Sequence, residues 1–397
     1  MRAVVWHGVG DIRLDDVPEP AVEDPGDAVV QVTTSAICGT DLHMVRGTMA
    51  GMEPGTVLGH EAVGVVAEVG EGVRNFRPGD RVVVPSTIGC GTCSYCRAGY
   101  YAQCDVANPG GRRAGTAFFG GPAATGSFDG LQAERARVPF ANVGLVPLPP
   151  QVSDEEGILL SDIFPTAWFG AQLAEVSQGD TVAVFGCGPV GLFAILSARL
   201  QGAGRVLAVD GVPSRLEQAR MLHAEVVDYT KEDPVAALVE LTGGIGPDRV
   251  IDAVGVDARS GGPGSGDAEE FRHELAEVAP RTRPDHGTWV PGDAPTQAVR
   301  WAVDAVAKAG TLSVIGVYPQ QAEHFPLGAA MNKNLTVNMG NCNHRAVIPD
   351  LVDLVAGGSV DIGSVLTQEE PFSDALDAYR TFDRREPGWT KVALTAA

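Results

Sequence analysis

Positive charge is scarce in this 397-residue sequence, in which 29 lysine and arginine residues stand against 50 aspartate and glutamate residues, a formal net charge of −21. An acidic surface repels phosphate backbones and anionic lipids, so the composition argues against nucleic-acid and membrane partners. The first residues also lack the long apolar run of a signal peptide. We therefore expect a cytoplasmic protein without a nucleic-acid or membrane partner.

An uninterrupted apolar segment is absent as well. The best candidate, residues 181–198, is broken by Gly186, Gly188, Pro189 and Gly191. Such a break does not suit one membrane-spanning helix, and a buried strand, a turn and a buried helix fit the segment better. The sequence has no internal repeats, and its apolar share of 44% is enough for a sizeable core in two or three domains.

A disulfide scaffold is not expected either, because the seven cysteines are odd in number and no secretion signal accompanies them. Four of them form a compact motif, Cys90-x2-Cys93-x2-Cys96-x7-Cys104. Short loops bring four thiolates into the tetrahedron that zinc prefers, and a shell of four protein ligands leaves no position for a substrate. We predict a structural zinc site, with an iron–sulfur cluster or four unrelated buried thiols as the alternatives.

Secondary-structure patterns divide the chain near residue 151. Short β-rich segments come first, between Gly and Pro turns, at residues 28–35, 62–69 and 81–84. Strands and helices then alternate, with strands expected at 181–185, 205–210, 249–254 and 311–317, helices at 189–201, 214–223, 347–356 and 372–382, and a closing strand at 391–394. Ser153 and Glu156 have the spacing of a helix cap. The pattern predicts an α/β protein, with a barrel-like antiparallel region followed by a parallel sheet covered on both faces.

Residues 256–296 interrupt this alternation. The segment is rich in Gly, Pro and charged residues, and only residues 271–278 have a helical pattern. It is longer than most structureless loops, so we interpret it as an insertion that is either functional or mobile.

A nucleotide-binding loop is indicated by Gly186-Cys187-Gly188-Pro189-Val190-Gly191, a GxGxxG motif between an expected strand and an expected helix. Its glycines permit a tight turn and close approach to a pyrophosphate at the positive end of the helix dipole. Asp210 ends the next strand, and its carboxylate would bind a ribose 2′-hydroxyl and repel a 2′-phosphate, which favours NAD over NADP. Arg215 would cover the adenine or, alternatively, bind a 2′-phosphate. A glycine turn without a ligand is the structural alternative.

Two short clusters before the four cysteines contain further metal-binding residue types. Cys38-Gly39-Thr40-Asp41-Leu42-His43 follows an expected strand, and Gly59-His60-Glu61 precedes another. A thiolate and an imidazole are suitable zinc ligands, and the segment Ser-Asp-Ile-Phe-Pro-Thr at 161–166 would supply a third.

The order of these motifs resembles the zinc-dependent medium-chain alcohol dehydrogenases over essentially the whole chain. The motifs are CGTDLH, GHE, the four-cysteine lobe, the segment around Asp162, GxGxxG with its acid, and VIGV at 314–317. SDIFPTAW at 161–168 and HMVRG at 43–47 resemble the branch of glutathione-independent formaldehyde dehydrogenases and formaldehyde dismutases. The resemblance implies a GroES-like β-barrel catalytic domain at residues 1–163, with its zinc lobe at about 88–106. It also implies a Rossmann NAD-binding domain at 164–340, which contains the 256–296 insertion, and a segment at 341–397 that returns to the catalytic domain.

Carried over residue by residue, the resemblance implies that Cys38, His60 and Asp162 bind a catalytic zinc ion and leave a fourth position open. Many members have cysteine where this chain has Asp162, a change that keeps the total ligand charge. Glu61 would stand behind these ligands or bind the metal transiently. Asp41 would hold the His60 ring through its other nitrogen.

The same resemblance implies further roles. Thr40 would accept the substrate proton and His43 would pass it towards solvent, although a plain surface histidine is the alternative for His43. Thr166, Val254 and Val317 match positions that contact the nicotinamide. Several relatives have a basic residue at the position of Gly39, and Arg345 is a candidate to supply that charge to the pyrophosphate. The substrate channel would be lined by Ser86, Ile88, Phe118, Phe119 and Phe164, whose apolar members suit a core equally well.

The implied protein is a homodimer or homotetramer with two Zn²⁺ ions per chain that transfers hydride between a small-molecule alcohol, expected to be primary, and NAD. An aldehyde dismutase is one alternative, because in the formaldehyde-oxidising branch an insertion in this region covers bound NAD and slows its release. A non-catalytic nucleotide-binding protein on the same fold is another, although it would not need an open metal-ligand set.

Overall fold

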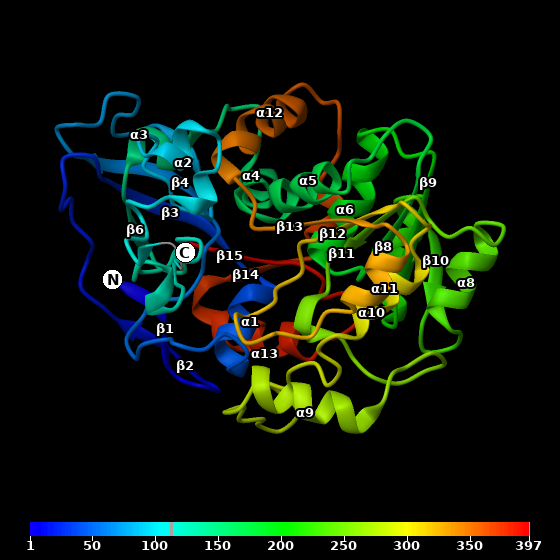
Figure 1. Ribbon diagram of the computed structural model, residues 1–397. Coiled ribbons are helices and arrows are strands. Elements are labelled where there is room, and N and C mark those ends of the chain that lie inside the picture. Colours follow the sequence, from blue (N-terminus) through cyan, green and yellow to red (C-terminus); the bar gives the residue numbers. More distant parts are fainter. Residues whose placement is uncertain (112–113, 397) are drawn as a thin grey trace. The chain divides into compact units, whose positions relative to one another are not determined.

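The computed structural model describes residues 1–111 and 114–396, which form two compact units (Figure 1). The first unit contains Met1–Pro165, Arg281–Val290 and Cys342–Ala397, and the second contains Thr166–Pro280 and Pro291–Asn341. The chain therefore passes from one unit to the other four times. The sequence predicts residues 281–290 in the Rossmann domain with the rest of the insertion, whereas the structure groups them with the first unit.

A seven-stranded sheet forms the body of the first unit, in the order β14-β15-β3-β4-β5-β7, with β6 also paired to β3. Its strands are β3 (Ala28–Ile37), β4 (Ala62–Val69), β5 (Arg81–Val84), β6 (Arg135–Val138), β7 (Val146–Pro147), β14 (Gln368–Pro371) and β15 (Val392–Thr395). All pairings are antiparallel except that of β14 with β15. Because β15 pairs with the end of β3, the C-terminal strand returns the chain to the unit in which it began. A separate hairpin consists of β1 (Arg2–Gly8) and β2 (Asp11–Asp16).

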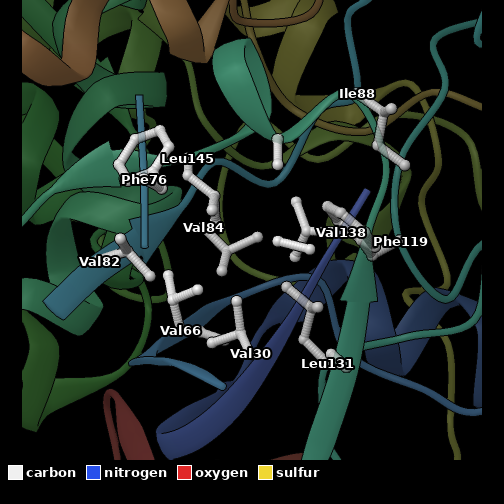
Figure 2. Close-up of a cluster of buried hydrophobic side chains, with 14 of the residues drawn as sticks. Val30, Val66, Phe76, Val82, Val84, Ile88, Phe119, Leu131, Val138 and Leu145 are labelled. Carbon is white, nitrogen blue, oxygen red and sulfur yellow. The ribbon is translucent and has the colours of Figure 1, made fainter. Parts of the chain in front are cut away.

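The core of this sheet is made by alternate residues of its strands. Val82 and Val84 of β5 are fully buried on one face, as a period of two requires. They point toward Val30 of β3, Val66 of β4 and Val138 of β6 (Figure 2). Branched side chains suit this pleated, buried surface, which is why these short Val-rich segments form strands.

Only some helices of the first unit begin at a capping side chain. The helices of this unit are α1 (Gly39–Arg46), α2 (Ser94–Arg97), α3 (Ala141–Gly144), α4 (Asp154–Ser161), α12 (His344–Ala356) and α13 (Ala375–Asp383). The expected cap of α4 is present, because Ser153 Oγ accepts the Glu156 N–H at 3.2 Å and Glu156 Oε2 accepts the Ser153 N–H at 3.0 Å. Helix α5 (Ile163–Leu173) begins in the first unit and continues into the second.

The second unit is a six-stranded parallel sheet in the order β10-β9-β8-β11-β12-β13 (Figure 1). Its strands are β8 (Thr181–Phe185), β9 (Arg205–Asp210), β10 (Glu225–Asp228), β11 (Arg249–Asp252), β12 (Thr311–Val314) and β13 (Thr336–Met339). Its other helices are α6 (Pro189–Leu200), α7 (Pro213–Met221), α8 (Pro234–Leu241), α9 (Ala268–Val278), α10 (Gln297–Ala305) and α11 (Leu327–Asn332). This is the Rossmann strand order, which reverses between β8 and β11, where such sheets bind their ligands. The α/β class is confirmed.

The insertion contributes to both units. Its helix α9 belongs to the second unit, where Arg300 of α10 pairs with Glu270 and with the buried Glu274. Its tip belongs to the first unit, because Trp289 is buried there in an apolar cluster with Trp6, Leu42 and Tyr379. An apolar side chain inside a long polar insertion therefore determines where residues 281–290 pack.

Several expected elements end earlier or begin later than the sequence suggests. The strand expected to run to residue 254 stops at Asp252, because the Asp252 carboxylate accepts the N–H groups of Val254 and Gly255 and turns the chain. The strand expected to run to residue 317 stops at Val314. The sequence pattern does not predict β1, β2, β6, β7, β10, β13 or β14; all but β1 and β2 are at most four residues long, and β2 and β14 consist mostly of polar residues. Among the helices of the described residues, none combines the length and the apolar character needed to span a membrane.

Candidate active site

The first candidate site lies in the first unit, where strand β3 meets helix α1. Cys38 follows the last residue of β3 and caps α1, with its N–H bonded to Asp41 Oδ2 at 2.9 Å. His60 and Glu61 directly precede β4, and Asp162 follows the last turn of α4. Three separate segments therefore bring the predicted ligands together.

The donor atoms of this site converge. One ligand atom from each of Cys38, His60, Glu61 and Asp162 lies within 4.8 Å of the others, and all four residues are buried. Asp162 Oδ2 is 3.3 Å from His60 Nε2 and 3.9 Å from Cys38 Sγ. A thiolate, an imidazole and a carboxylate in this arrangement form a typical zinc donor set.

The polar atoms of the cluster fit a bound cation. His60 Nε2 is buried and makes no hydrogen bond of good geometry, although it lies 3.3 Å from Asp162 Oδ2, and Glu61 Oε1 is buried without a hydrogen-bond partner among the described residues. Such buried polar atoms are costly unless a ligand satisfies them. Burial raises the pKa of the Cys38 thiol, and the neighbouring Glu61 raises it further, so a thiolate here needs a positive charge. The donor set therefore fits a divalent metal ion better than it fits an empty apolar core.

Two further polar groups contact these donors on the side away from the cluster: Asp41 contacts His60, and Lys391 contacts Glu61. His60 Nδ1 lies 3.1 Å from Asp41 Oδ1, so the expected carboxylate contact is present and Nε2 faces the cluster. Glu61 Oε2 pairs with the fully buried ammonium of Lys391, which also donates to the Ile37 carbonyl at 3.2 Å. Sequence reasoning missed Lys391, which precedes the closing strand and lies 330 residues from its partner.

Sequence reasoning also missed His344. This buried residue starts α12, and its Nε2 lies 2.7 Å from Asp162 Oδ1. Although burial lowers its pKa, the neighbouring Cys342 and Asp162 outweigh that effect and raise the pKa of His344 to about 10. Ser86, expected in the substrate channel, places its Oγ 3.3 Å from Asp162 Oδ1 and 3.2 Å from His344 Nε2.

The residues of the expected proton path lie on α1. Thr40 is half-buried in its first turn, with its hydroxyl 4.0 Å from Cys38 Sγ. His43 is one turn further, on the same helix face, and is buried rather than at the surface. Its Nδ1 lies 2.7 Å from Thr48 Oγ1, and that hydroxyl donates to the His43 carbonyl at 3.2 Å. The hydroxyl therefore accepts from Nδ1–H, which leaves Nε2 as the basic nitrogen.

The four cysteines of the predicted structural site converge as well. Cys90, Cys93, Cys96 and Cys104 each place a sulfur within 4.8 Å of the others, and all are free thiols. Backbone N–H groups point at the sulfurs, among them those of Thr92 and Cys93 at Cys90 Sγ, at 3.4 and 3.3 Å. Although burial raises the pKa of Cys90, these bonds and the Thr92 hydroxyl lower it to about 6. Cys90 thus favours thiolate, the form that binds zinc, whereas burial raises the pKa of the Cys96 and Cys104 thiols, which a bound cation would reverse.

In the second unit, the GxGxxG motif forms the turn from β8 to α6. Gly186 has a φ of +89°, and a Cβ at Gly191 would lie 1.8 Å from the Gly186 carbonyl oxygen, so both positions require glycine. Pro189 is the first residue of α6, Val190 follows it, and Gly188 caps the helix. The Asp210 carboxylate holds this turn, because it accepts the N–H groups of Cys187 at 2.7 Å and Val212 at 2.8 Å.

Two of the other predicted cofactor contacts, Arg215 and Val254, lie near this turn. Arg215 of α7 extends to the loop, since a Cβ at Gly188 would meet its Nη1 at 3.8 Å. Val254 packs against Gly186, and the Val317 carbonyl accepts the Val256 N–H at 3.0 Å. Thr166, the first residue of the second unit, is half-buried on α5.

The expected channel residues divide into two groups. Ile88 and Phe119 belong to the buried core of Figure 2, and Phe164 is fully buried. Phe118 is partly exposed and meets the His60 ring edge-on, at 6.2 Å between ring centroids. Phe118 is therefore the aromatic side chain of this set that adjoins the candidate metal site.

Known proteins match both units. Residues 24–150 match the family model of the alcohol dehydrogenase GroES-like domain, and residues 189–260 match that of the zinc-binding dehydrogenases. AdhB of Bacillus subtilis, described as an uncharacterized zinc-type alcohol dehydrogenase-like protein, is 37% identical over 398 residues, covering 99% of this chain and 100% of that protein. The glutathione-independent formaldehyde dehydrogenase of Pseudomonas aeruginosa is 38% identical over 398 residues, covering 97% of this chain and 96% of that protein.

A solved structure agrees with these matches. The alcohol dehydrogenase TADH from Thermus sp. ATN1 superposes with a TM-score of 0.81 at 35% identity and covers 100% of both chains. The fold, the converging donor residues and relatives that match over nearly their full length lead to one assignment. The chain belongs to the zinc-type alcohol dehydrogenases of the medium-chain dehydrogenase family, and it is an oxidoreductase with a GroES-like domain and a Rossmann domain.

Proposed function

We propose that this enzyme transfers hydride between a primary alcohol and NAD, using one catalytic and one structural zinc ion per chain. The observation that carries the proposal is the convergence of Cys38, His60, Glu61 and Asp162 within 4.8 Å. A zinc ion held there would act as a Lewis acid towards the substrate oxygen, while NAD supplies the hydride chemistry. The Cys90, Cys93, Cys96 and Cys104 site offers no open position, so its zinc would be structural.

Thr40 and His43 would move the substrate proton. The Thr40 hydroxyl lies beside the donor cluster and is suited to take a proton from an alcohol. His43 lies one turn further with Nε2 as its basic nitrogen, because Thr48 accepts from Nδ1–H. Removal of the hydroxyl in Thr40→Val should lower kcat by about 10²- to 10⁴-fold. His43→Gln should alter the pH–rate profile, and an unchanged profile would exclude His43 from the proton path.

The second unit would bind NAD at the turn after β8, with the pyrophosphate at the start of α6. Asp210 supports this assignment, because a carboxylate at the end of β9 repels the 2′-phosphate of NADP. Arg215 beside the loop would cover the adenine. Val254, Val317 and Thr166 would contact the nicotinamide, and Arg345 would contribute positive charge to the pyrophosphate.

The test is to follow NADH absorbance with a panel of primary, secondary and aromatic alcohols, with NAD and NADP in parallel. We expect NAD reduction with primary alcohols and loss of that activity in Asp162→Ala. Asp353→Asn, an exposed change on α12, is the matched control. Metal analysis should find two zinc ions per chain. The proposal would be contradicted if protein that holds zinc fails to reduce NAD with every alcohol of the panel.

A second candidate function is aldehyde dismutation on a retained NAD, and the insertion favours it. The segment begins directly after Val254, a predicted nicotinamide contact, and its tip is fastened by Trp289 in the first unit. A segment anchored in this way is suited to restrict cofactor release. Freshly purified protein should then contain NAD and should convert an aldehyde to alcohol and acid without added cofactor. Nucleotide-free protein would exclude this candidate.

We also propose that the enzyme is a homodimer that pairs through the second unit. Strand β13 is an edge strand of the parallel sheet, and a free edge can pair with a second copy. Met339 on that strand and Leu327 and Met331 on α11 are 62%, 71% and 77% exposed. Exposed apolar side chains beside a free edge are typical of a subunit interface.

A further inference from the structure

The two oxygens of the Asp162 carboxylate have different surroundings. Oδ2 faces the donor cluster, 3.3 Å from His60 Nε2 and 3.9 Å from Cys38 Sγ. Oδ1 faces away from it, 2.7 Å from His344 Nε2 and 3.3 Å from Ser86 Oγ. The protein therefore occupies one oxygen and leaves the other directed at the metal-binding donors.

His344 is itself held in place on both sides of its ring. Thr87 Oγ1 lies 3.1 Å from its Nδ1, and Ser86 Oγ lies 3.2 Å from its Nε2. The Ser86 N–H also donates to the Ser161 carbonyl at 3.2 Å, which ties the segment after β5 to the end of α4. The imidazole is 2% exposed, so solvent cannot replace it.

A carboxylate needs such a partner to act as a defined ligand. It can bind a cation through one oxygen or through both, and it can rotate between these states. A hydrogen bond to the outer oxygen fixes its orientation, and loss of such a bond in other metal sites weakens metal affinity about 10–100-fold. The short contact to His344 makes it the main holder of Oδ1, and Ser86 is the weaker one.

We propose that His344 is a positioning residue of the candidate metal centre, which holds Asp162 Oδ1 so that only Oδ2 is presented to the cation. This inference rests on the proposed function, since it requires a metal ion at that site. It assigns a task to a residue that lies 182 positions from Asp162 in the sequence. Ser86 and Thr87 fix the imidazole from the opposite segment.

The experiment compares His344→Leu, which removes the N–H donor, with His344→Gln, which keeps one. Asp353→Asn on the exposed side of the same helix is the control. Each protein is equilibrated with zinc against chelators of graded strength, and bound zinc per chain is measured. The four-cysteine lobe serves as the internal reference, because Asp162 is not part of it.

We expect His344→Leu to bind one of its two zinc ions 10–100-fold more weakly and to retain the other unchanged. His344→Gln should recover most of that loss, and the cobalt-substituted His344→Leu protein should show a changed d–d spectrum. If His344 had a merely structural role, His344→Leu would change the melting temperature but would cause neither a selective loss of zinc nor a changed cobalt spectrum.

An unchanged affinity for both zinc ions and an unchanged cobalt spectrum in His344→Leu would overturn this inference and leave the proposed function intact. If Asp162→Ala binds as much zinc as the wild-type protein, the proposed metal centre is wrong, and the inference fails with it. Should His344→Leu not fold, His344→Asn, whose shorter amide does not reach Oδ1, supplies the same comparison.

Discussion

A buried ion pair ties the tip of the insertion to the first unit, and breaking it should destabilise that unit strongly. Arg46 of α1 is fully buried and donates through Nε to Asp383 Oδ1 at 2.8 Å. The other oxygen of Asp383 accepts the Trp289 N–H at 2.7 Å. Asp383→Leu would therefore leave a guanidinium and a backbone N–H without this acceptor in a buried position.

The expected magnitude follows from the burial of the pair. Removal of one partner of a buried ion pair costs about 3–5 kcal/mol, because the remaining charge is not compensated. If the free energy of unfolding falls by about 3 kcal/mol per molar urea, the urea concentration at the unfolding midpoint of the first unit should fall by about 1–1.7 M. The double variant Arg46→Met/Asp383→Leu should regain most of this loss, since apolar residues often replace a buried pair without cost.

Urea unfolding followed by tryptophan fluorescence measures this effect, because Trp289 and Trp6 belong to the cluster around the pair. The two units are expected to unfold separately, so the transition of the first unit is the one compared. Asp377→Asn, in an exposed pair with Arg380 on the same helix, is the control and should leave the midpoint near wild type. A loss below about 1 kcal/mol in Asp383→Leu, or a double variant no more stable than the single one, would refute the reasoning.

Four further predictions concern the four-cysteine lobe (two of them), cofactor choice and assembly. Cys104→Ser should release one zinc ion per chain, seen by metal analysis, while the second stays bound. In metal-free protein the lowered pKa of Cys90 favours the folded lobe, and this stabilisation is lost as the pH falls from the ordinary thiol value of 9.0 through about 6. Thermal melts between these two pH values would detect it, because the raised pKa values of Cys96 and Cys104 destabilise the folded lobe only at higher pH. Asp210→Asn should raise kcat/KM for NADP relative to NAD at least about tenfold, a change of about 1.4 kcal/mol, measured by steady-state kinetics. Met331→Glu should shift the protein towards monomer in sedimentation experiments, and an unchanged sedimentation coefficient would argue against an interface at α11.

Much of the architecture could be predicted from local patterns. The strands at 62–69, 81–84, 181–185 and 205–210 match β4, β5, β8 and β9, because apolar, branched residues between turn residues are a local signal. Short polar strands such as β13 and β14 were missed, since their pairing depends on neighbouring strands rather than on their own residues.

The sequence by itself determined the chemistry that depends on spacing. Four cysteines within 15 residues, a GxGxxG between strand and helix, and Asp41 three residues after Cys38 are local arrangements, and the structure shows each of them folded as a local unit. In such motifs the short chain segment itself limits where the side chains can lie.

Only the tertiary structure decided which distant polar groups meet. His344 contacts Asp162 across 182 residues, Lys391 pairs with Glu61 across 330, and Trp289 reaches Asp383 across 94. No periodicity marks a buried histidine or lysine, because its partner is chosen by the packing of whole elements and by the cost of leaving a buried polar group unsatisfied. Because each buried polar group needs a partner, these few long-range contacts determine which side chains surround the candidate metal site.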